Sequence, residues 1–172
     1  HLTGMEVANA SMYDGSTACW EAVAMAGRVT KRSRAVLCRG LHPHYVATVR
    51  TMAQFTGDTV DCRKPRLEPL PDIAGVIDAI DGETSCVVVQ YPDFFGRIYD
   101  YTKLIDAAHE KGALVCIVAN PTALLMLKAP GDMGADIVVG EAQPFGIPLW
   151  YGGPYLGFFT TKKSYVHKMA GR

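Results

Sequence analysis

The sequence lacks the short motifs that mark the commonest nucleotide-binding and hydrolase sites. No GxGxxG joins a strand to a helix, no GxxxxGK[ST] phosphate loop is present, and no GxSxG turn offers a serine nucleophile. The sequence therefore gives no support to a Rossmann dinucleotide site, a P-loop or an α/β-hydrolase nucleophile. Acids and bases for other chemistry exist in Asp93, Glu141 and His42, but the sequence alone does not bring them into one site.

An excess of either charge is also absent. Lys+Arg and Asp+Glu both number 17, so we expect neither nucleic acid nor an anionic membrane surface as the main partner. The one basic run, residues 28–34 (RVTKRSR), has no aromatic stacking platform beside it and is better explained as a solvated helix end. No apolar run is long enough to span a bilayer and no signal peptide is recognisable, so no membrane partner is predicted.

Closely spaced cysteine pairs are missing. The chain has five cysteines and no CxxC, which favours a reducing compartment, and we expect a cytoplasmic protein. Cys38, His42 and His44 together suggest a metal site, but the ligand set is incomplete and no metal is predicted.

Length and composition indicate an ordinary globular chain. The 172 residues, 49% hydrophobic and 20% charged, suffice for a single domain spanning 1–172 with a substantial core. The chain begins at His1 without Met and stops at Arg172 just after a helix-like segment. We therefore expect a truncated piece of a longer protein.

Apolar runs and helical patterns alternate along the chain, which predicts an α/β fold with a mostly parallel sheet between two helical layers. The last strand follows a loop too short for a parallel crossover and should run antiparallel. A Pro-rich connector is expected at 63–71 (RKPRLEPLP). Strands are predicted at 34–39, 59–62, 86–90, 113–118, 135–139 and 155–160, and helices at 14–27, 45–55, 72–80, 99–110, 121–127 and 162–169.

The first predicted helix opens with Asp14-Gly15-Ser16-Thr17. Asp14 or Ser16 would cap it and Gly27 would end it. Its free N–H groups could hold a phosphate, but an ordinary N-cap is favoured because Gly-Ser-Thr is a weak motif.

Two loops at strand ends are candidates for recognition. Phe94 and Phe95 follow the central strand at 86–90, where open α/β sheets place ligands, and are either hydrophobic filler or a recognition surface. Residues 140–157 are rich in Gly and Pro, which gives that loop a specified shape. We expect a cofactor, a substrate or another subunit to lie on it.

Three segments resemble one enzyme family. NASMYDGSTACWEA, VVVQYPDFFG and GADIVVGEAQPFGIPLWYGGPYLGFFTTKKSYVHKMAGR are similar to glycine dehydrogenase (decarboxylating), the P protein of the glycine cleavage system. The likeness is greatest to subunit 1, the N-terminal-half subunit of the two-subunit bacterial form. It covers nearly the whole chain, and the last motif is long enough to be highly specific.

The resemblance implies a fold, a reaction and a cofactor. The fold would be most of the large domain of the aspartate-aminotransferase-like (fold type I) pyridoxal-phosphate fold, with a seven-stranded, mainly parallel sheet. The reaction would decarboxylate glycine and transfer its aminomethyl group to the lipoyl arm of H protein. Pyridoxal phosphate needs a lysine for its Schiff base, and in the catalytic half that lysine follows the strand matching 135–139.

At this lysine position the chain has Gln143, preceded by Ala142 where the family has histidine. The aspartate that faces the pyridine nitrogen is also missing, since its region here is residues 116–120 (CIVAN). The resemblance therefore implies a non-catalytic subunit with no catalytic residue of its own. Gly15, Ser16 and Thr17 would be a vestigial phosphate cradle, and Lys162 and Lys163 surface charges.

The expected partners are glycine dehydrogenase subunit 2, which would carry the lysine and the pyridoxal phosphate, and the lipoylated H protein, in a heterotetramer of two subunit types. Two alternatives stay open at this point. One is a self-sufficient pyridoxal-phosphate enzyme acting on a small amino acid, and the other is a scaffold fragment without activity.

Overall fold

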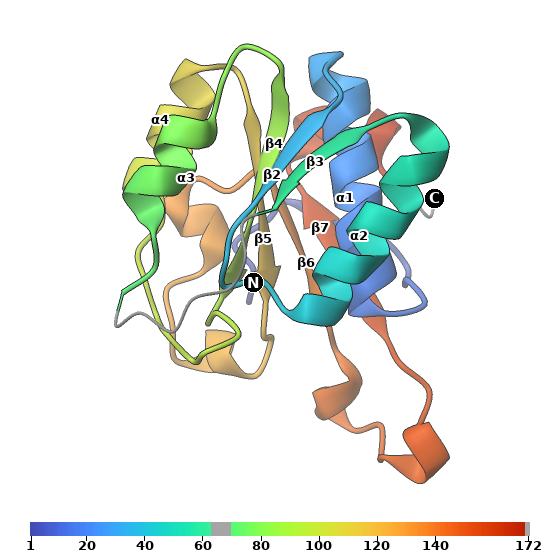
Figure 1. Cartoon of the computed structure of the whole chain (residues 1–172). Helices are drawn as coiled ribbons and strands as arrows, with labels where there is room; N and C mark the ends of the chain where they lie inside the picture. The colour runs from blue at the N-terminus through green and yellow to red at the C-terminus, as the bar shows by residue number, and fades with distance from the viewer. Residues whose placement is uncertain (63–69, 171–172) are drawn as a thin grey trace.

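The computed structural model describes residues 1–62 and 70–170, so most of the connector expected at 63–71 lies outside the described residues (Figure 1). The described strands form one seven-stranded sheet in the order β1-β7-β6-β5-β4-β2-β3. Their bounds are Val7–Ala8 for β1, Arg34–Leu37 for β2, Thr59–Cys62 for β3, Thr84–Tyr91 for β4, Leu114–Ala119 for β5, Ile137–Glu141 for β6 and Gly157–Thr161 for β7.

Strand directions confirm the predicted mixed sheet. Strands β2 to β6 all run parallel to one another. Strand β7 pairs antiparallel with β6. Strand β1 was not predicted, because two residues show no period. It forms by pairing with β7, Val7 opposite Thr161.

Helices cover both faces of the sheet (Figure 1). Helices α1 (Gly15–Thr30) and α2 (Pro43–Thr56) pack on one face, and α3 (Ile73–Ala79) and α4 (Thr102–Glu110) on the other. In β4, Cys86 and Val88 join the core under α1, while Val87 and Val89 join the core under α3 and α4. Every one of these side chains is buried, which explains the unbroken apolar run of a central parallel strand.

Three predicted helices end or wind differently. Helix α1 continues through Gly27 to Thr30 and ends at Lys31, whose φ of 62° is left-handed. The prediction that Gly27 ends it was wrong, because glycine only weakens a helix that is packed along its length. The segments predicted as α-helices at 121–127 and 162–169 instead hold 3₁₀ turns, η1 (Ala123–Leu125) and η5 (Lys163–Lys168), a form that proteins use in short pieces.

The basic run at 28–34 is less solvated than expected. Arg34 is three-quarters buried and pairs with Asp61 at 2.7 Å and with Asp81 at 3.2 Å. Arg32 donates to the carbonyls of Thr84 and Lys111. Both arginines thus link segments at the amino ends of the strands. The interpretation of the basic run as a solvated helix end is therefore correct for only part of it.

Residues 142–156 join β6 to β7 and project beyond the sheet as a long hairpin, which we call the arm (Figure 1). The arm contains two 3₁₀ turns, η3 (Gln143–Phe145) and η4 (Trp150–Gly152). Among the described residues, no helix is long and apolar enough to cross a membrane.

Candidate functional site

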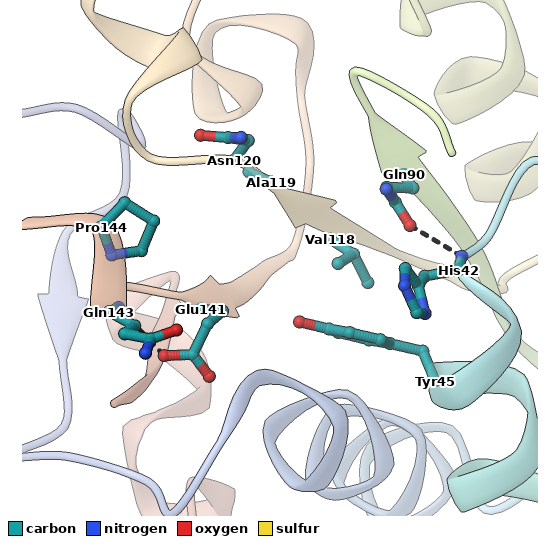
Figure 2. Close-up of a pocket in the computed structure, with 9 residues that line it drawn as sticks. All are labelled: His42, Tyr45, Gln90, Val118, Ala119, Asn120, Glu141, Gln143 and Pro144. Atoms are coloured by element: carbon teal, nitrogen blue, oxygen red, sulfur yellow. Dashed lines mark hydrogen bonds between the residues drawn. The ribbon is translucent and has the colours of Figure 1, made fainter. Parts of the chain in front are cut away.

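The candidate site lies at the carboxyl edge of the parallel strands. The chain passes from β2 to β3 on one side and then returns to β4 on the other side of β2, so the winding reverses there. Open α/β sheets bind ligands outside the strand ends near such a reversal. A cavity of about 190 Å³ opens at this edge, and Figure 2 shows the side chains around it. It is lined by His42, Tyr45, Gln90, Val118, Ala119, Asn120, Glu141, Gln143 and Pro144.

The amino end of α1 is closed by Asp14. Its carboxylate accepts the backbone N–H groups of Ser16 and Thr17, at 2.7 and 3.0 Å, and the Ser16 hydroxyl at 2.6 Å. Burial alone would raise the pKa of Asp14, but the hydrogen bonds from Ser16 and Thr17 outweigh it and lower that pKa. The ordinary N-cap favoured from the sequence is confirmed, with Asp14 as the capping residue.

Glu141 supplies a second carboxylate at the same helix end. One of its oxygens accepts the N–H of Gly15 at 3.1 Å, and the other accepts the N–H groups of Gln143 at 3.0 Å and Leu156 at 2.7 Å. Glu141 therefore joins α1 to both ends of the arm. A negative charge at a helix amino end is favourable, because the exposed N–H groups and the macrodipole are positive there.

Two aromatic residues at the start of α2 form the opposite wall of the cavity. The Gln90 side chain accepts the His42 N–H at 2.8 Å, as Figure 2 shows. Burial lowers the pKa of His42, and neighbouring His44 lowers it further. The hydroxyl of Tyr45 lies so close to Gly15 that a Cβ there would be 2.0 Å from it. Burial, with Cys19 and Glu141 nearby, raises the pKa of Tyr45.

Gln143 begins the arm and faces the cavity from the β6 side (Figure 2). Its side-chain nitrogen is buried and has no hydrogen-bond partner among the described residues. Asn120, just beyond β5, is occupied in capping, since its side-chain oxygen accepts the N–H groups of Thr122 and Ala123. Among the described residues, no lysine lines this cavity or the adjoining depression of about 360 Å³ beside Asp14 and Tyr155.

These residues do not fit pyridoxal phosphate. The N–H groups of Gly15, Ser16 and Thr17 already donate to carboxylates. A phosphate placed there would face the two carboxylates at close range, and like charges repel one another. As far as the structure describes them, the cavity walls supply neither a lysine nor an aspartate at the end of β5.

Other sequence candidates lie at this edge but are engaged. Asp93 is 5% exposed, and its side chain binds Arg97 at 2.6 Å and caps the turn at Phe95. Phe94 packs edge-on against His42, with ring centroids 5.0 Å apart. In the described part of the chain, no cluster of three or more His, Cys, Asp or Glu could hold a metal ion.

A charged cluster that no sequence pattern indicates lies at the opposite edge of the sheet, where the parallel strands begin. Asp136, 2% exposed, pairs with Lys162 at 2.5 Å and with His109 at 2.7 Å, and accepts the Val115 N–H at 2.8 Å. Lys162 is therefore partly buried and paired, which corrects its prediction as a surface charge, whereas Lys163 is exposed as predicted. The three groups lie far apart in sequence, so only the sheet brings them together.

Comparisons with known proteins fit this architecture. The model of the family described as Glycine cleavage system P-protein matches residues 1–172. The chain belongs to this family. It is 58% identical over 172 residues to a probable glycine dehydrogenase (decarboxylating) subunit 1 of Novosphingobium aromaticivorans and 57% identical to that of Erythrobacter litoralis. Each match covers 99% of this chain but 38% of the relative, so the chain spans about two fifths of these P-protein relatives.

Solved structures give the same result. A crystal structure of glycine decarboxylase (P-protein) in inhibitor-bound form superposes with a TM-score of 0.89 at 42% identity, over 99% of this chain and 38% of that one. Cystathionine gamma-lyase from Lactobacillus plantarum, 19% identical, superposes with a TM-score of 0.74 over 97% of this chain and 41% of its own, and it supports the fold alone. The predicted aspartate-aminotransferase-like (fold type I) architecture is confirmed.

Proposed function

We propose that this P-protein chain belongs to the non-catalytic subunit of a glycine decarboxylase. The whole enzyme would decarboxylate glycine and transfer the aminomethyl group to the lipoyl arm of H protein. The observation that carries the proposal is the cavity itself. It lies at the carboxyl edge of the parallel strands, where open α/β sheets bind ligands. Gln143, which the resemblance aligns with the family's lysine, lines it, and Glu141 accepts the N–H of Gly15 at the start of α1.

The cofactor would lie on a second polypeptide. Pyridoxal phosphate, where bound, supplies an electron sink for decarboxylation, and it requires a lysine amine for attachment. Because the described cavity walls of this chain lack that amine, glycine dehydrogenase subunit 2 would provide it. The relatives' name, subunit 1, supports the existence of such a partner.

We further propose a heterotetramer of the two subunit types in the cytoplasm, with the lipoylated H protein as the third component. In this assembly the chain would bind and position its partner without forming or breaking a bond to glycine. Its five cysteines are free and distributed along the fold, which is compatible with a reducing compartment.

Reconstitution tests the proposal. The natural polypeptide that carries this chain is purified alone and with subunit 2, and exchange of bicarbonate into glycine is measured with lipoylated H protein. We expect activity only in the mixture, with borohydride reduction fixing pyridoxal phosphate to subunit 2 alone. A reduced adduct on this chain would indicate a self-sufficient enzyme, and a mixture without complex or activity would indicate a scaffold.

A further inference from the structure

The arm presents an apolar surface with no charge on it. Residues 142–156 (AQPFGIPLWYGGPYL) contain no acidic, basic or histidine side chain. Five large apolar side chains on the arm are exposed, with Leu149 at 84% and Tyr151 at 111% of their reference areas. The other three are Phe145, Trp150 and Tyr155. A loop that faces only solvent usually carries polar side chains, because a large exposed apolar patch is unfavourable in water.

The arm is also held in one shape. At its base, Glu141 binds the N–H groups of Gln143 and Leu156, and the Ala142 N–H donates to the Leu156 carbonyl at 2.7 Å. At its tip, Tyr151 has a φ of 40°, in the left-handed region that a tyrosine seldom adopts. A preorganised loop loses less conformational entropy on binding.

The exposed area approaches what one side of a stable interface needs. With ~200 Å² for a large side chain, the five residues offer on the order of 700 Å². A standard protein interface buries about 800 Å² per partner, and tryptophan and tyrosine dominate its binding energy. An uncharged surface of this size is suited to an equally apolar groove, because a charged partner group would lose its hydration without gaining a counter-charge.

We propose that the arm is the anchor by which this chain binds the second, lysine-bearing subunit, an inference that rests on the proposed function. Gln143 both begins the arm and lines the cavity, so a polypeptide seated on the arm also covers the cavity mouth. That partner carries the lysine which the described walls of this cavity lack. A second copy of this chain would be equally lysine-less at this position and would leave the assembly without the amine.

The test compares two substitutions in the natural polypeptide that carries this chain. Leu149→Ala combined with Trp150→Ala removes the centre of the arm surface. Phe55→Ala, at an 82% exposed position on α2 outside the arm, is the matched control. Titration calorimetry with subunit 2 should show a dissociation constant at least 100-fold higher for the arm variant and changed less than threefold for the control. Thermal unfolding of each variant alone should match that of the unsubstituted subunit.

The outcomes separate this inference from the function beneath it. If the unsubstituted subunit fails to bind subunit 2, the proposed function is wrong and the arm loses its partner. If it binds and the arm variant binds equally well, only the arm inference is overturned. If the arm variant, measured without subunit 2, has a lowered thermal stability, the arm packs on its own polypeptide. If the arm variant loses self-association but still binds subunit 2, the arm binds a second copy of this chain. Either result overturns the proposal.

Discussion

The two ends of strand β6 carry carboxylates with different partners. At the amino end, Asp136 pairs with Lys162 and His109 and is almost fully buried. At the carboxyl end, Glu141 accepts three backbone N–H groups, from Gly15, Gln143 and Leu156. Both acids join elements that are distant in sequence. At the amino end, an ion pair with Lys162 and hydrogen bonds to His109 and Val115 hold the body of the fold together. At the carboxyl end, hydrogen bonds from backbone N–H groups fix the position of a loop.

The largest expected effect is at the amino end. Asp136→Ala should lower the free energy of unfolding by about 3 kcal/mol, because it leaves Lys162 without its buried partner and the Val115 N–H without an acceptor. Urea unfolding measures the change. Asp106→Asn, an exposed acid on α4, is the control and should change stability by less than about 0.5 kcal/mol. Equal effects of the two substitutions would remove the distinction between buried and exposed acids.

A smaller loss of stability is expected at the carboxyl end. Glu141→Ala should lower the free energy of unfolding by roughly 1–2 kcal/mol. The loss is small because the N–H groups that donate to Glu141 are only partly buried and can donate to water in the variant. Its clearest signature is local: amide hydrogen exchange at Gln143 and Leu156 should accelerate, while exchange in β4 should stay unchanged. Glu141→Gln keeps an acceptor oxygen and should preserve slow exchange. Uniform acceleration across the sheet would show that Glu141 supports the whole fold and not the arm.

The smallest effect concerns Asp14 and depends on pH. Its folded pKa is lowered, so its contribution is fully present above the unfolded value of about 3.9 and is lost as pH falls through the folded value. Asp14→Ala should therefore reduce the free energy of unfolding by about 1 kcal/mol at pH 7 and by progressively less below pH ~4. Unfolding curves at several pH values measure this difference. A constant difference down to the lowest pH would show that the carboxylate charge is irrelevant to the cap.

Sequence patterns predicted the body of the fold because local signals there agree with packing. The apolar run that became β4 and the helix predicted at 45–55, which became α2, depend on neighbours a few residues away. The antiparallel β7 followed from loop length alone. Strand β1 and the two 3₁₀ segments escaped prediction, because distant contacts or weak helix nucleation decide them.

The candidate site was predicted only in part. The Asp14 cap is a local feature and was recognised, and the position of Gln143 came from resemblance to a family. The role of Glu141 was missed, since its bond to Gly15 spans 126 positions of sequence. Lys162 was misjudged for the same reason: nothing near it in sequence indicates that Asp136 is buried beside it.

Strand β1 has a consequence for the order in which the chain folds. Because β1 pairs with β7, Val7 cannot pair until Thr161 has been synthesised. Met12, which pairs with Gly157, is under the same constraint. During synthesis the strands β2 to β6 can assemble as they emerge, whereas this edge of the sheet closes only after β7 has been made. Pairings between such distant positions form slowly, because closing the long loop between them costs conformational entropy before the contact is made. The early segment at residues 1–13 thus joins the sheet late, and a ribosome stalled before β7 would display a body without that edge.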